Sequence, residues 1–395
     1  MSAHIVIAGG GLAAQRCCDT LRRAGHRGRI TLVCAEPVVP YDRPPLSKQV
    51  LAGELDLAAV ALRPPGWYAD RGVELLLGRA AAALHADRHQ LELRDGGVLG
   101  YDRLLIATGA EPRRLPLFDG APNVHLLRTA DDAARLREAL RPGVRLLVIG
   151  AGFIGQEVAA TARALGVRVT MLEAMAAPLA GLLGHELGTW FADLHRDEGV
   201  DVRCGVTAAG ARRDERGRIT GVTTADGRTF ACDVVLVGTG VTPADGWLAG
   251  SGLGGGGVEC DHAGRTALPD VFAAGDVARP YDRLARAHGR SEHWEAAARQ
   301  GAAAARAMLG AGRGDAALAS FWSDQYGLRV QYVGHASLGD TVELDGDLTE
   351  RDFAAVWRSR GRPVAALLVG RPRALPQMRR LVEEGLEHQP QEMTV

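Results

Sequence analysis

The chain has 395 residues, a length that predicts about two to three domains with substantial cores. Hydrophobic residues make up 47% and charged residues 24%, as in an ordinary globular protein, and the net charge of −1 argues against a nucleic-acid-binding protein. No apolar run reaches the length of a membrane span and no signal peptide precedes the first strand, so we expect a cytoplasmic protein.

The first predicted unit consists of a strand, a glycine-rich turn with its helix, and a second strand, at residues 5–8, 9–24 and 29–33. Gly9, Gly11 and Ala14 fit the G-x-G-x-x-G/A pattern of dinucleotide-binding turns, and the acidic Glu36 follows at the expected distance. The first glycine allows a tight turn, the second lets the backbone approach a pyrophosphate, and the small third residue packs helix on strand. The free N–H groups of the helix then bind the phosphates.

The same unit recurs later in the chain. Gly150, Gly152 and Gly155 open a second helix, and a strand at 168–172 ends beside the acidic Glu173. One glycine pattern alone is weak, but an internal repeat of the complete unit is specific. The sequence therefore predicts two dinucleotide sites.

Shorter elements are predicted between and after the two units. The first group comprises strands at 75–78 and 90–94 that flank Gly96-Gly97 as a hairpin-like insertion, a strand with a glycine turn at 104–109, and an extended linker at 111–116. The second comprises strands at 234–240 and 270–276 and a long helix at 294–309. The tail alternates like antiparallel strands at 330–334, 341–344, 353–357 and 364–369, before a closing helix at 376–386.

With these motifs, the chain resembles the FAD/NAD(P) flavoproteins with two dinucleotide folds, and more narrowly the ferredoxin reductases of bacterial cytochrome P450 and Rieske oxygenase systems. The resemblance covers essentially the whole chain and rests on segments 9–11, 40–48, 107–109, 127–129, 152–157, 266–276, 290–294 and 321–326. It implies an α/β fold with two Rossmann-like domains and a C-terminal α+β domain. The expected ranges are 1–112 with 241–318 for FAD, 113–240 for NAD, and 319–395 for the C-terminal domain.

The resemblance also implies an FAD site. Its residues would be Gly9, Gly11, Leu12, Ala13, Ala14, Glu36, Arg43, Lys48, Ala81, Thr108, Gly109, Arg128, Asp276 and Trp294. Asp276 would hydrogen-bond the ribityl chain, with a helix N-cap as its alternative role. Glu36 is assigned to the adenosine ribose, although relatives often carry the acid where this chain has Ala35.

The implied NAD site comprises Gly150, Gly152, Phe153, Ile154, Gly155, Glu157, Glu173, Gly238 and Gly240. Glu173 should accept the ribose 2′-OH and repel a 2′-phosphate, and residues 174–177 contain no arginine to bind that phosphate. We therefore expect NADH to be preferred over NADPH. Glu157 would lie near the nicotinamide; its alternative role is a favourable charge at a helix N-terminus.

Lys48 is the one lysine of the sequence, in which all other basic residues of the Lys+Arg count are arginines. One interpretation is a solvent-exposed lysine on a surface loop that has no functional role. The resemblance instead places Lys48 beside the flavin, where its ammonium would stabilise the negative charge that follows hydride transfer from NADH. We expect the catalytic residues to be Lys48, Glu157 and Trp294.

The electron acceptor is predicted from cysteine positions. No C-x-x-C pair exists, so no metal site is expected, and residues 41–50, where disulfide reductases and related oxidases carry cysteines, contain none. The acceptor should then be a small [2Fe–2S] ferredoxin that approaches the flavin directly. Such ferredoxins are acidic, and the predicted basic collar consists of Arg279, Arg283, Arg286 and Arg290, or these form a solvated loop. Trp322 is a candidate contact residue, or part of a core.

Other functions remain open from the sequence. A rubredoxin reductase or NADH oxidase would use the same cofactors, and a signalling flavoprotein similar to apoptosis-inducing factor would use the same fold. The last would need a basic surface for DNA, which the net charge does not favour. We expect no nucleic-acid or membrane partner, and a monomer or weak homodimer.

Overall fold

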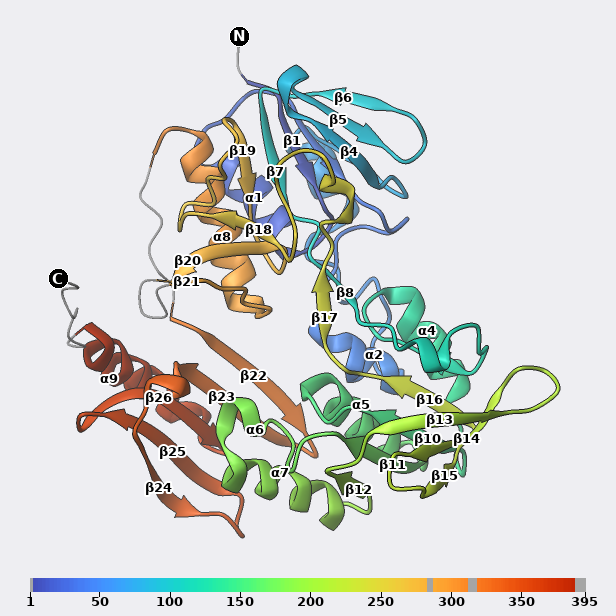
Figure 1. Ribbon diagram of the computed structural model, residues 1–395. Coiled ribbons are helices and arrows are strands. Elements are labelled where there is room, and N and C mark those ends of the chain that lie inside the picture. Colours follow the sequence, from blue (N-terminus) through green and yellow to red (C-terminus); the bar gives the residue numbers. More distant parts are fainter. Residues whose placement is uncertain (1–2, 283–286, 312–317, 388–395) are drawn as a thin grey trace. The chain divides into compact units, whose positions relative to one another are not determined.

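The computed structural model describes residues 3–282, 287–311 and 318–387 (Figure 1). The chain divides into two compact units. The first comprises Met1–Arg43, Asp56–Glu111 and Val241–Ala317, and the second Pro44–Leu55, Pro112–Gly240 and Leu318–Val395. Segment 44–55 thus joins the second unit, although the predicted boundaries grouped it with the first range. Within the described residues, no helix is long and apolar enough to cross a membrane.

The first unit is built on a parallel sheet in the order β19-β7-β1-β2-β3. Its strands are β1 (Ile5–Ala8), β2 (Ile30–Val33), β3 (Val73–Leu76), β7 (Arg103–Ile106) and β19 (Val271–Ala273). Every residue of β1 and β2 is buried, as expected for strands covered on both faces. Ile5 and Ile7 pack into a core with the helices, whereas Val6 and Ala8 pack into a core on the opposite face.

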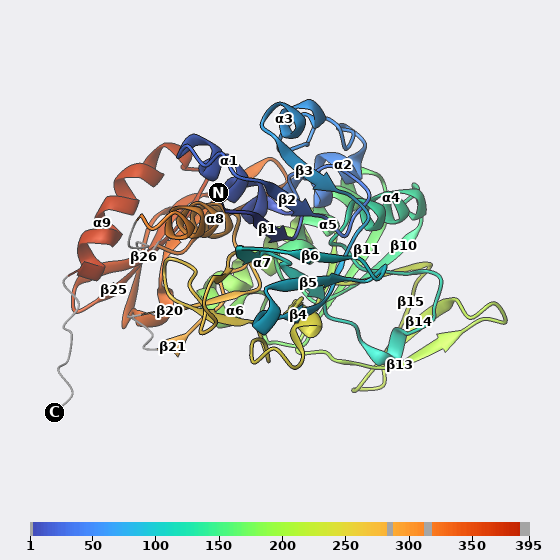
Figure 2. The same ribbon diagram turned by 90° about the horizontal axis from the view of Figure 1, so that it is seen from above.

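Helices cover one face of this sheet and short strands cover the other. The helices are α1 (Leu12–Arg23), α3 (Pro65–Asp70) and α8 (Trp294–Met308), of which α1 and α8 lie side by side (Figures 1 and 2). The opposite core includes residues of the antiparallel sheet of β4 (Ala81–His85), β5 (Gln90–Leu93) and β6 (Val98–Gly100). A further small sheet contains β18 (Val258–Cys260), β20 (Ala278–Asp282) and β21 (Ala287–His288).

One predicted strand is wrong. The sequence assigned 75–78 to the hairpin-like insertion, but β3 covers Val73–Leu76 and extends the parallel sheet beside β2. The insertion instead consists of β4, β5 and β6, with a turn at Asp95–Gly97. The three leucines at 75–77 are too short a run to carry a periodicity that distinguishes a parallel edge strand from a hairpin strand. The predicted linker at 111–116 also begins inside a strand, β8 (Ala110–Pro112), which pairs with β17 (Val241–Pro243).

The second unit repeats this architecture with a parallel sheet in the order β12-β11-β10-β16-β9. Its strands are β9 (Val124–His125), β10 (Arg145–Ile149), β11 (Arg168–Glu173), β12 (Asp201–Cys204) and β16 (Val234–Val237). Leu146 and Val148 pack with residues of the helices α4 (Ala130–Ala139) and α5 (Phe153–Ala164). Leu147 and Ile149 pack on the other face, with residues of the small sheet β13 (Ala208–Arg213), β14 (Ile219–Thr224) and β15 (Thr229–Ala231).

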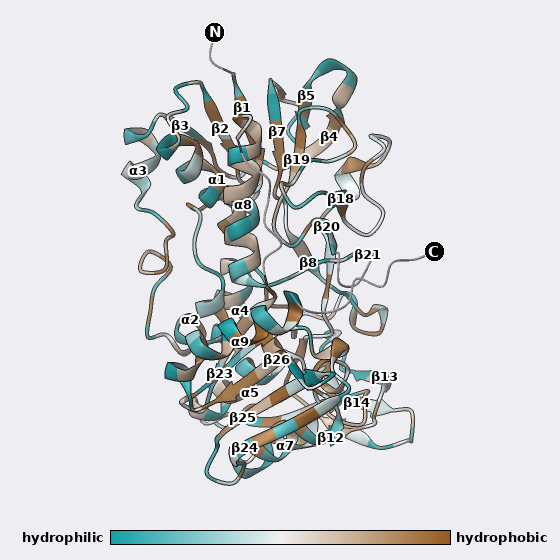
Figure 3. Cartoon of the chain, turned by 90° about the vertical axis from the view of Figure 1, so that its left-hand side faces the viewer, coloured by the Kyte–Doolittle hydropathy of each residue, from teal (hydrophilic) through white to brown (hydrophobic). Residues whose placement is uncertain are grey.

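The C-terminal part of the second unit is a five-stranded antiparallel sheet in the order β22-β23-β26-β25-β24. Its strands are β22 (Ser320–Gln325), β23 (Leu328–Gly334), β24 (Thr341–Asp347), β25 (Asp352–Ser359) and β26 (Arg362–Val369), followed by α9 (Leu375–Glu387). Hydrophobic and polar residues alternate along β24 (Figure 3). This sheet shares its core with α6 (Ala180–Leu183) and α7 (His185–Asp197), while α2 (Gln49–Ala52) adds Leu51 to the core of the parallel sheet.

The sequence missed β22. Phe321, Ser323 and Gln325 are buried in this strand, so its inward face carries two polar residues. A strand is recognised by apolar residues at alternate positions, and these polar side chains hide the pattern. The predicted tail strands and the long helix at Trp294 are confirmed.

Candidate active site

The glycine-rich turn of the first unit is shaped by close contact with a neighbouring strand end. Gly9 has φ +133°, and a Cβ at this position would lie 2.0 Å from the carbonyl oxygen of Ala107. Only glycine fits both the backbone conformation and the space. Gly11 caps α1 in an extended conformation, and a Cβ there would meet nothing within 4 Å. The turn therefore presents the N-terminus of α1 to open space, as a phosphate group requires.

Two further glycines, one in a turn and one in α8, pack closely against the start of α1. A Cβ on Gly275 would lie 3.2 Å from the Cβ of Ala13, and one on Gly301 of α8 would lie 2.1 Å from the Ala13 carbonyl oxygen. The Gly275 N–H donates to Oε1 of Gln300 at 2.7 Å. Asp276 follows in the turn between β19 and β20, and no helix begins there, so its alternative role as a helix N-cap is wrong.

The predicted ribose ligand Glu36 is held by residues of its own loop. Its carboxylate accepts hydrogen bonds from the Tyr41 hydroxyl at 2.7 Å and from the Arg43 guanidinium at 3.0 Å. Asp42, which lies between Tyr41 and Arg43, accepts a hydrogen bond from Nε1 of Trp294 at 2.6 Å. These contacts fix the loop and the Trp294 ring within the first unit.

Four other predicted FAD residues have defined places in the structure. Thr108 donates through its hydroxyl to the carbonyl oxygen of Ala244 at 2.7 Å, and Gly109 follows with φ +75°. Ala81 begins β4 and packs against the core below the parallel sheet. Arg128 lies in the second unit, where its backbone N–H donates to Asp132 in the N-terminal capping box of α4. Their roles toward FAD stay predictions.

The second unit contains the same turn with tighter helix packing. Gly150 has φ +98°, and a Cβ there would lie 2.6 Å from the carbonyl oxygen of Gly238. A Cβ on Gly155 would lie 2.3 Å from the carbonyl oxygen of Gly150, so α5 approaches the turn more closely than alanine permits. Gly152 has open space around it, and Gly240 has φ +94°.

Glu173 lies at the end of β11 beside this turn. Its Oε2 accepts a hydrogen bond from the backbone N–H of Ala151 at 2.7 Å, and its Oε1 accepts one from Met175 at 2.8 Å. The carboxylate thus stands next to the glycine-rich loop, and its role toward the ribose stays a prediction. At the start of α5, Phe153 contacts the ring of Phe321 at 4.5 Å, whereas the Ile154 side chain is exposed.

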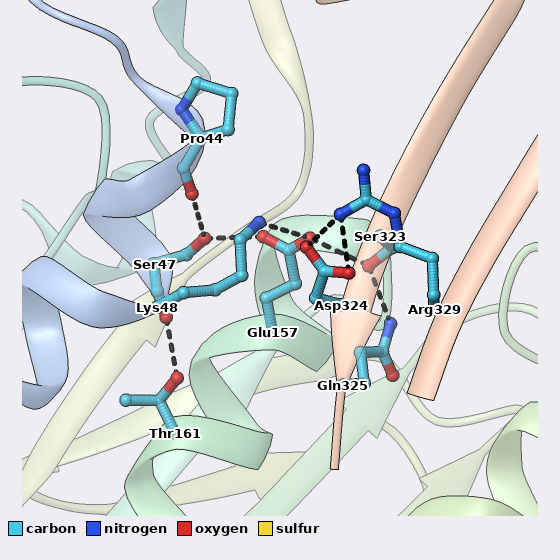
Figure 4. Close-up of polar contacts among 9 residues, drawn as sticks. All are labelled: Pro44, Ser47, Lys48, Glu157, Thr161, Ser323, Asp324, Gln325 and Arg329. Carbon is cyan, nitrogen blue, oxygen red and sulfur yellow. Dashed lines mark hydrogen bonds and ion pairs between the residues drawn. The ribbon is translucent and has the colours of Figure 1, made fainter. Parts of the chain in front are cut away.

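Lys48 and Glu157 form a buried ion pair inside the second unit (Figure 4). Nζ of Lys48 lies 3.0 Å from Oε1 of Glu157, and their side chains are 11% and 5% exposed. The same carboxylate accepts hydrogen bonds from the hydroxyls of Ser47 and Ser323. Thr161, one turn further along α5, donates to the Ser47 carbonyl oxygen at 2.8 Å. Lys48 is therefore not a solvated surface lysine, and Glu157 has a role beyond a charge at a helix end.

Sequence reasoning missed the polar partners of this pair. Ser47 stands directly before Lys48, but Ser323 lies on the unrecognised strand β22. Gln325 and His195 extend the network beyond Ser323. Residues 323–325 are all polar, so the sequence offers no alternation of polar and apolar residues that would mark the strand or its inward face.

The predicted collar arginines are paired with acids where the structure describes them. Arg279 lies 3.5 Å from Glu259, and Arg290 lies 2.9 Å from Glu292. Arg283 and Arg286 lie outside the described residues. Trp322 is half-buried on β22, with the Arg329 guanidinium 5.2 Å from its ring centre. The collar and the contact role of Trp322 stay predictions.

The cysteines have no redox partner in the structure. All six are free thiols, and Cys17, Cys18 and Cys34 are buried in the first unit. Burial raises the pKa of the Cys34 thiol to about 12 and raises the pKa values of Cys17 and Cys18 as well. A thiol of this kind is a poor nucleophile at neutral pH. In the part of the chain that the structure describes, no cluster of side chains is arranged to hold a metal ion.

The profile of the pyridine nucleotide-disulphide oxidoreductase family matches residues 3–301, and a reductase C-terminal family matches residues 320–394. The chain belongs to the pyridine nucleotide-disulphide oxidoreductase family. The predicted α/β fold with two Rossmann-like domains and a C-terminal domain is thereby confirmed, as are the cofactors FAD and NAD(H).

Named relatives define the branch of the family. The ferredoxin reductase subunit of 5,5′-dehydrodivanillate O-demethylase from a Sphingobium strain is 39% identical over 385 residues, covering 96% of this chain and 93% of the relative. Putidaredoxin reductase from Pseudomonas putida is 35% identical over 393 residues, covering 98% and 93%. The ferredoxin–NAD(+) reductase component of the biphenyl dioxygenase system from Paraburkholderia xenovorans is 40% identical, covering 87% and 84%.

A solved structure supports the same assignment. The covalent putidaredoxin reductase–putidaredoxin complex matches with a TM-score of 0.93 and 35% identity, covering 97% of this chain and 93% of that chain. The predicted resemblance to bacterial ferredoxin reductases is confirmed, and with it the class of enzyme, an oxidoreductase of the ferredoxin–NAD(+) reductase type.

Proposed function

We propose that this chain is an NADH:ferredoxin oxidoreductase that passes electrons from NADH through FAD to a [2Fe–2S] ferredoxin serving a cytochrome P450 or Rieske oxygenase. The observation that carries the proposal is the presence of two complete dinucleotide cradles in a chain whose thiols are all free and mostly buried. Relatives that match nearly the whole chain carry the names of ferredoxin reductases from such systems. FAD, when bound, takes a hydride from NADH and releases the electrons one at a time.

The first unit is the proposed FAD site. Gly9 permits the turn, and the open space at Gly11 leaves the N–H groups of α1 free to bind a pyrophosphate. In this proposal Asp276, which follows Gly275 in the turn after β19, accepts hydrogen bonds from hydroxyl groups of the ribityl chain. Trp294, whose ring is fixed by Asp42, lines the same site.

The second unit is the proposed NADH site. Gly150 and Gly152 form the turn that binds the pyrophosphate, and Glu173 accepts hydrogen bonds from the hydroxyls of the adenosine ribose. Glu173 is already bound by the N–H of Ala151, so a 2′-phosphate would approach a fixed carboxylate. The negative charges of the carboxylate and of the 2′-phosphate would repel each other, which supports a preference for NADH over NADPH.

Glu157 of the Lys48–Glu157 pair lies on α5, the helix that begins at the NADH turn, whereas Lys48 directly precedes α2. We propose that this pair orients the reacting end of NADH, since a buried, hydrogen-bonded ion pair keeps its charges in fixed places. A lysine ammonium is a compact charge on a flexible stem, whereas arginine is planar and needs more space. The stabilisation of reduced flavin by Lys48 stays a prediction.

Ferredoxin is the proposed acceptor because the family's sulfur relay has no counterpart here. Residues 41–50 contain no cysteine, and burial leaves Cys34 protonated at neutral pH. Rubredoxin or oxygen as acceptor is the alternative. If the arginine collar guides an acidic ferredoxin, raising the ionic strength should weaken its apparent affinity. An affinity independent of salt argues against the collar.

The function is tested by anaerobic titration of the purified flavoprotein with NADH and NADPH, followed by cytochrome c reduction with a panel of ferredoxins. We expect NADH to bleach the flavin and a [2Fe–2S] ferredoxin to be needed for rapid cytochrome c reduction. Rubredoxin and oxygen serve as acceptors in control reactions. A preparation without bound flavin, or full turnover with oxygen alone, contradicts the proposal.

Location and assembly are part of the proposal. NADH as the electron donor and free thiols both suit the reducing cytoplasm. We propose a monomer or weak homodimer, which sedimentation of the flavoprotein at several concentrations tests.

A further inference from the structure

A line of hydrogen bonds leads from Tyr326 to Glu157 through the core of the second unit. The Tyr326 hydroxyl lies 2.7 Å from Nδ1 of His195, and Nε2 of His195 lies 3.0 Å from Oε1 of Gln325. Nε2 of Gln325 donates to the Ser323 hydroxyl at 3.1 Å, and Ser323 donates to Oε1 of Glu157 at 2.7 Å. The last two links are drawn in Figure 4.

The donors and acceptors in this line permit one direction. Glu157 accepts from Ser323, so the Ser323 oxygen is left to accept from the amide nitrogen of Gln325. The amide oxygen of Gln325 then faces His195 and needs an N–H at Nε2. His195 is left with Nδ1 as acceptor for the Tyr326 hydroxyl. Every hydrogen therefore points toward the Glu157 carboxylate.

Burial keeps the line in this state. Ser323 and His195 are fully buried, and Gln325 is 1% exposed. Loss of hydration lowers the pKa of His195 to about 4, so its ring is neutral at physiological pH. A neutral ring has one donor and one acceptor, which the line uses fully.

A branch connects the same histidine to the NADH turn. Oε1 of Gln156 lies 3.3 Å from Nε2 of His195 and shares with Gln325 the single N–H at that nitrogen, and Nε2 of Gln156 donates to the carbonyl oxygen of Ala151 at 2.8 Å. Gln156 directly precedes Glu157 on α5, so the histidine reaches both the glycine-rich loop and the ion pair. A shift of His195 would thus disturb two groups of the proposed NADH site.

We propose that Ser323, Gln325 and His195 are positioning residues for hydride transfer, which hold the Glu157 carboxylate and hence the Lys48 ammonium at fixed places. This inference rests on the proposed function, because it assigns the C-terminal strand β22 a part in the NADH half-reaction. Each link is a dipole directed at a buried anion, and such fixed dipoles stabilise charge without rearrangement during the reaction. In the proposed function Lys48 and Glu157 meet the reacting end of NADH, and Ser323 contacts Glu157, so the three residues act through that pair.

The test is a graded series of variants of the whole flavoprotein: Ser323→Ala, Gln325→Met and Tyr326→Phe. The rate of flavin reduction at saturating NADH is measured anaerobically by stopped flow. We expect a decrease of about tenfold for Ser323→Ala, a smaller one for Gln325→Met and the smallest for Tyr326→Phe, because a displaced group costs less the further it lies from Glu157. The NADH concentration at half-saturation should change little, since Gly152 and Glu173 are untouched.

Asp324→Asn is the matched control. Asp324 lies between Ser323 and Gln325 on β22 but pairs with Arg329 at 2.8 Å outside the line (Figure 4). We expect its flavin reduction rate to equal that of the original chain. Ser323→Thr keeps the hydroxyl and should restore most of the rate lost in Ser323→Ala, which separates a donor from a merely structural residue.

The outcomes distinguish the two proposals. If NADH fails to reduce the flavin of the unaltered protein, the proposed function is wrong. If NADH reduces it and the Ser323→Ala and Gln325→Met variants react at the unaltered rate, the positioning role is wrong. Lower thermal stability in the series with unchanged reduction rates would likewise leave the line a structural feature and overturn the inference.

Discussion

The two dinucleotide folds of this chain share a framework and differ at the residue that fastens the glycine-rich turn. In both parallel sheets the first strand of the repeat lies between the second strand and a later one, and the first glycine is pressed against the backbone at that later strand's end. The Gly9 N–H donates to Val33 and the Gly150 N–H to Leu172, both at 2.8 Å. This pairing aligns the two repeats residue by residue.

The alignment places Cys34 of the first fold at the position of Glu173 in the second. Glu173 binds the N–H of Ala151, whereas Cys34 fills the space beside Gly10, where a Cβ would lie 2.8 Å from its sulfur. The acid of the first fold is Glu36, two residues later, and its partners lie in its own loop. One turn is thus fastened by a charged hydrogen bond and the other by packing.

The two folds also differ in the groups that surround the helix after the turn. The second fold surrounds Glu157 with hydrogen-bond donors, whereas buried thiols and aliphatic residues surround α1 in the first. The stability of a polar interior depends on whether every buried polar group has a hydrogen-bond partner, and that of an apolar interior on how completely side chains fill its volume. Similar backbones therefore respond differently to the same kind of substitution.

The largest effect is expected from alanine at the first glycine of either turn. Gly9→Ala and Gly150→Ala each place a Cβ within 2.6 Å of a carbonyl oxygen on a left-handed backbone, which costs about 1–3 kcal/mol in backbone strain before the overlap is counted. We expect Gly9→Ala to lose bound FAD. Gly150→Ala should keep FAD and bind NADH at least about tenfold more weakly.

FAD content per chain and anaerobic titration with NADH measure the two effects separately. Reduction of the Gly150→Ala flavin by dithionite serves as the control that the cofactor is intact. If Gly150→Ala also loses FAD, the two turns do not act independently and the comparison fails.

The next effect concerns the buried ion pair. Lys48→Met leaves the Glu157 carboxylate buried without its cation, which should lower the free energy of unfolding by roughly 3–5 kcal/mol. Adding Glu157→Gln to that variant should restore much of the stability but not the rate of flavin reduction. Lys48→Arg should keep FAD and slow reduction, because the guanidinium does not occupy the same place.

Denaturant unfolding and stopped-flow reduction of the single and double variants measure the coupling between the two residues. Additive losses of stability would show that the pair is not coupled. Unchanged reduction in Lys48→Arg would assign Lys48 a purely structural role.

Much of this framework was predictable from the sequence, because glycine turns and helix starts are local patterns. The repeat, α1, α8 and the acid Glu173 were found in this way. The partner of Lys48 was not, since Glu157 lies on another element and the contact depends on how segment 44–55 packs in the second unit. Strand β22 was missed for the same reason: its polar residues are explained only by partners distant in sequence.

A third effect depends on pH and concerns the polar interior of the second fold. Burial lowers the pKa of His195 from 6.5 to about 4, so between these values the unfolded chain binds a proton that the folded chain does not. Stability therefore falls as the pH decreases through this window, by about 2 kcal/mol between about pH 7 and 5 and by about 3 kcal/mol in all, and stops changing through this group only once the pH is below the folded pKa.

The contribution of His195 is the difference between the original chain and His195→Gln in denaturant unfolding at several pH values. The variant should be less stable near neutral pH but lose less stability on acidification. An identical pH dependence of the two proteins would mean that folding does not change the pKa of His195.

The smallest effect is expected at the aligned positions Cys34 and Glu173. Glu173→Gln removes the charge that holds the Ala151 N–H, a hydrogen bond worth about 1.5 kcal/mol or somewhat more, so NADH should bind about tenfold more weakly. Repulsion of a 2′-phosphate should decrease as well, which narrows the preference for NADH over NADPH.

Cys34→Ala removes only a buried sulfur, so FAD should be retained with a small loss of stability. Binding constants for both nucleotides and FAD content per chain measure these outcomes. A loss of FAD in Cys34→Ala larger than the loss of NADH binding in Glu173→Gln would show that packing fastens a dinucleotide turn more firmly than a charged hydrogen bond.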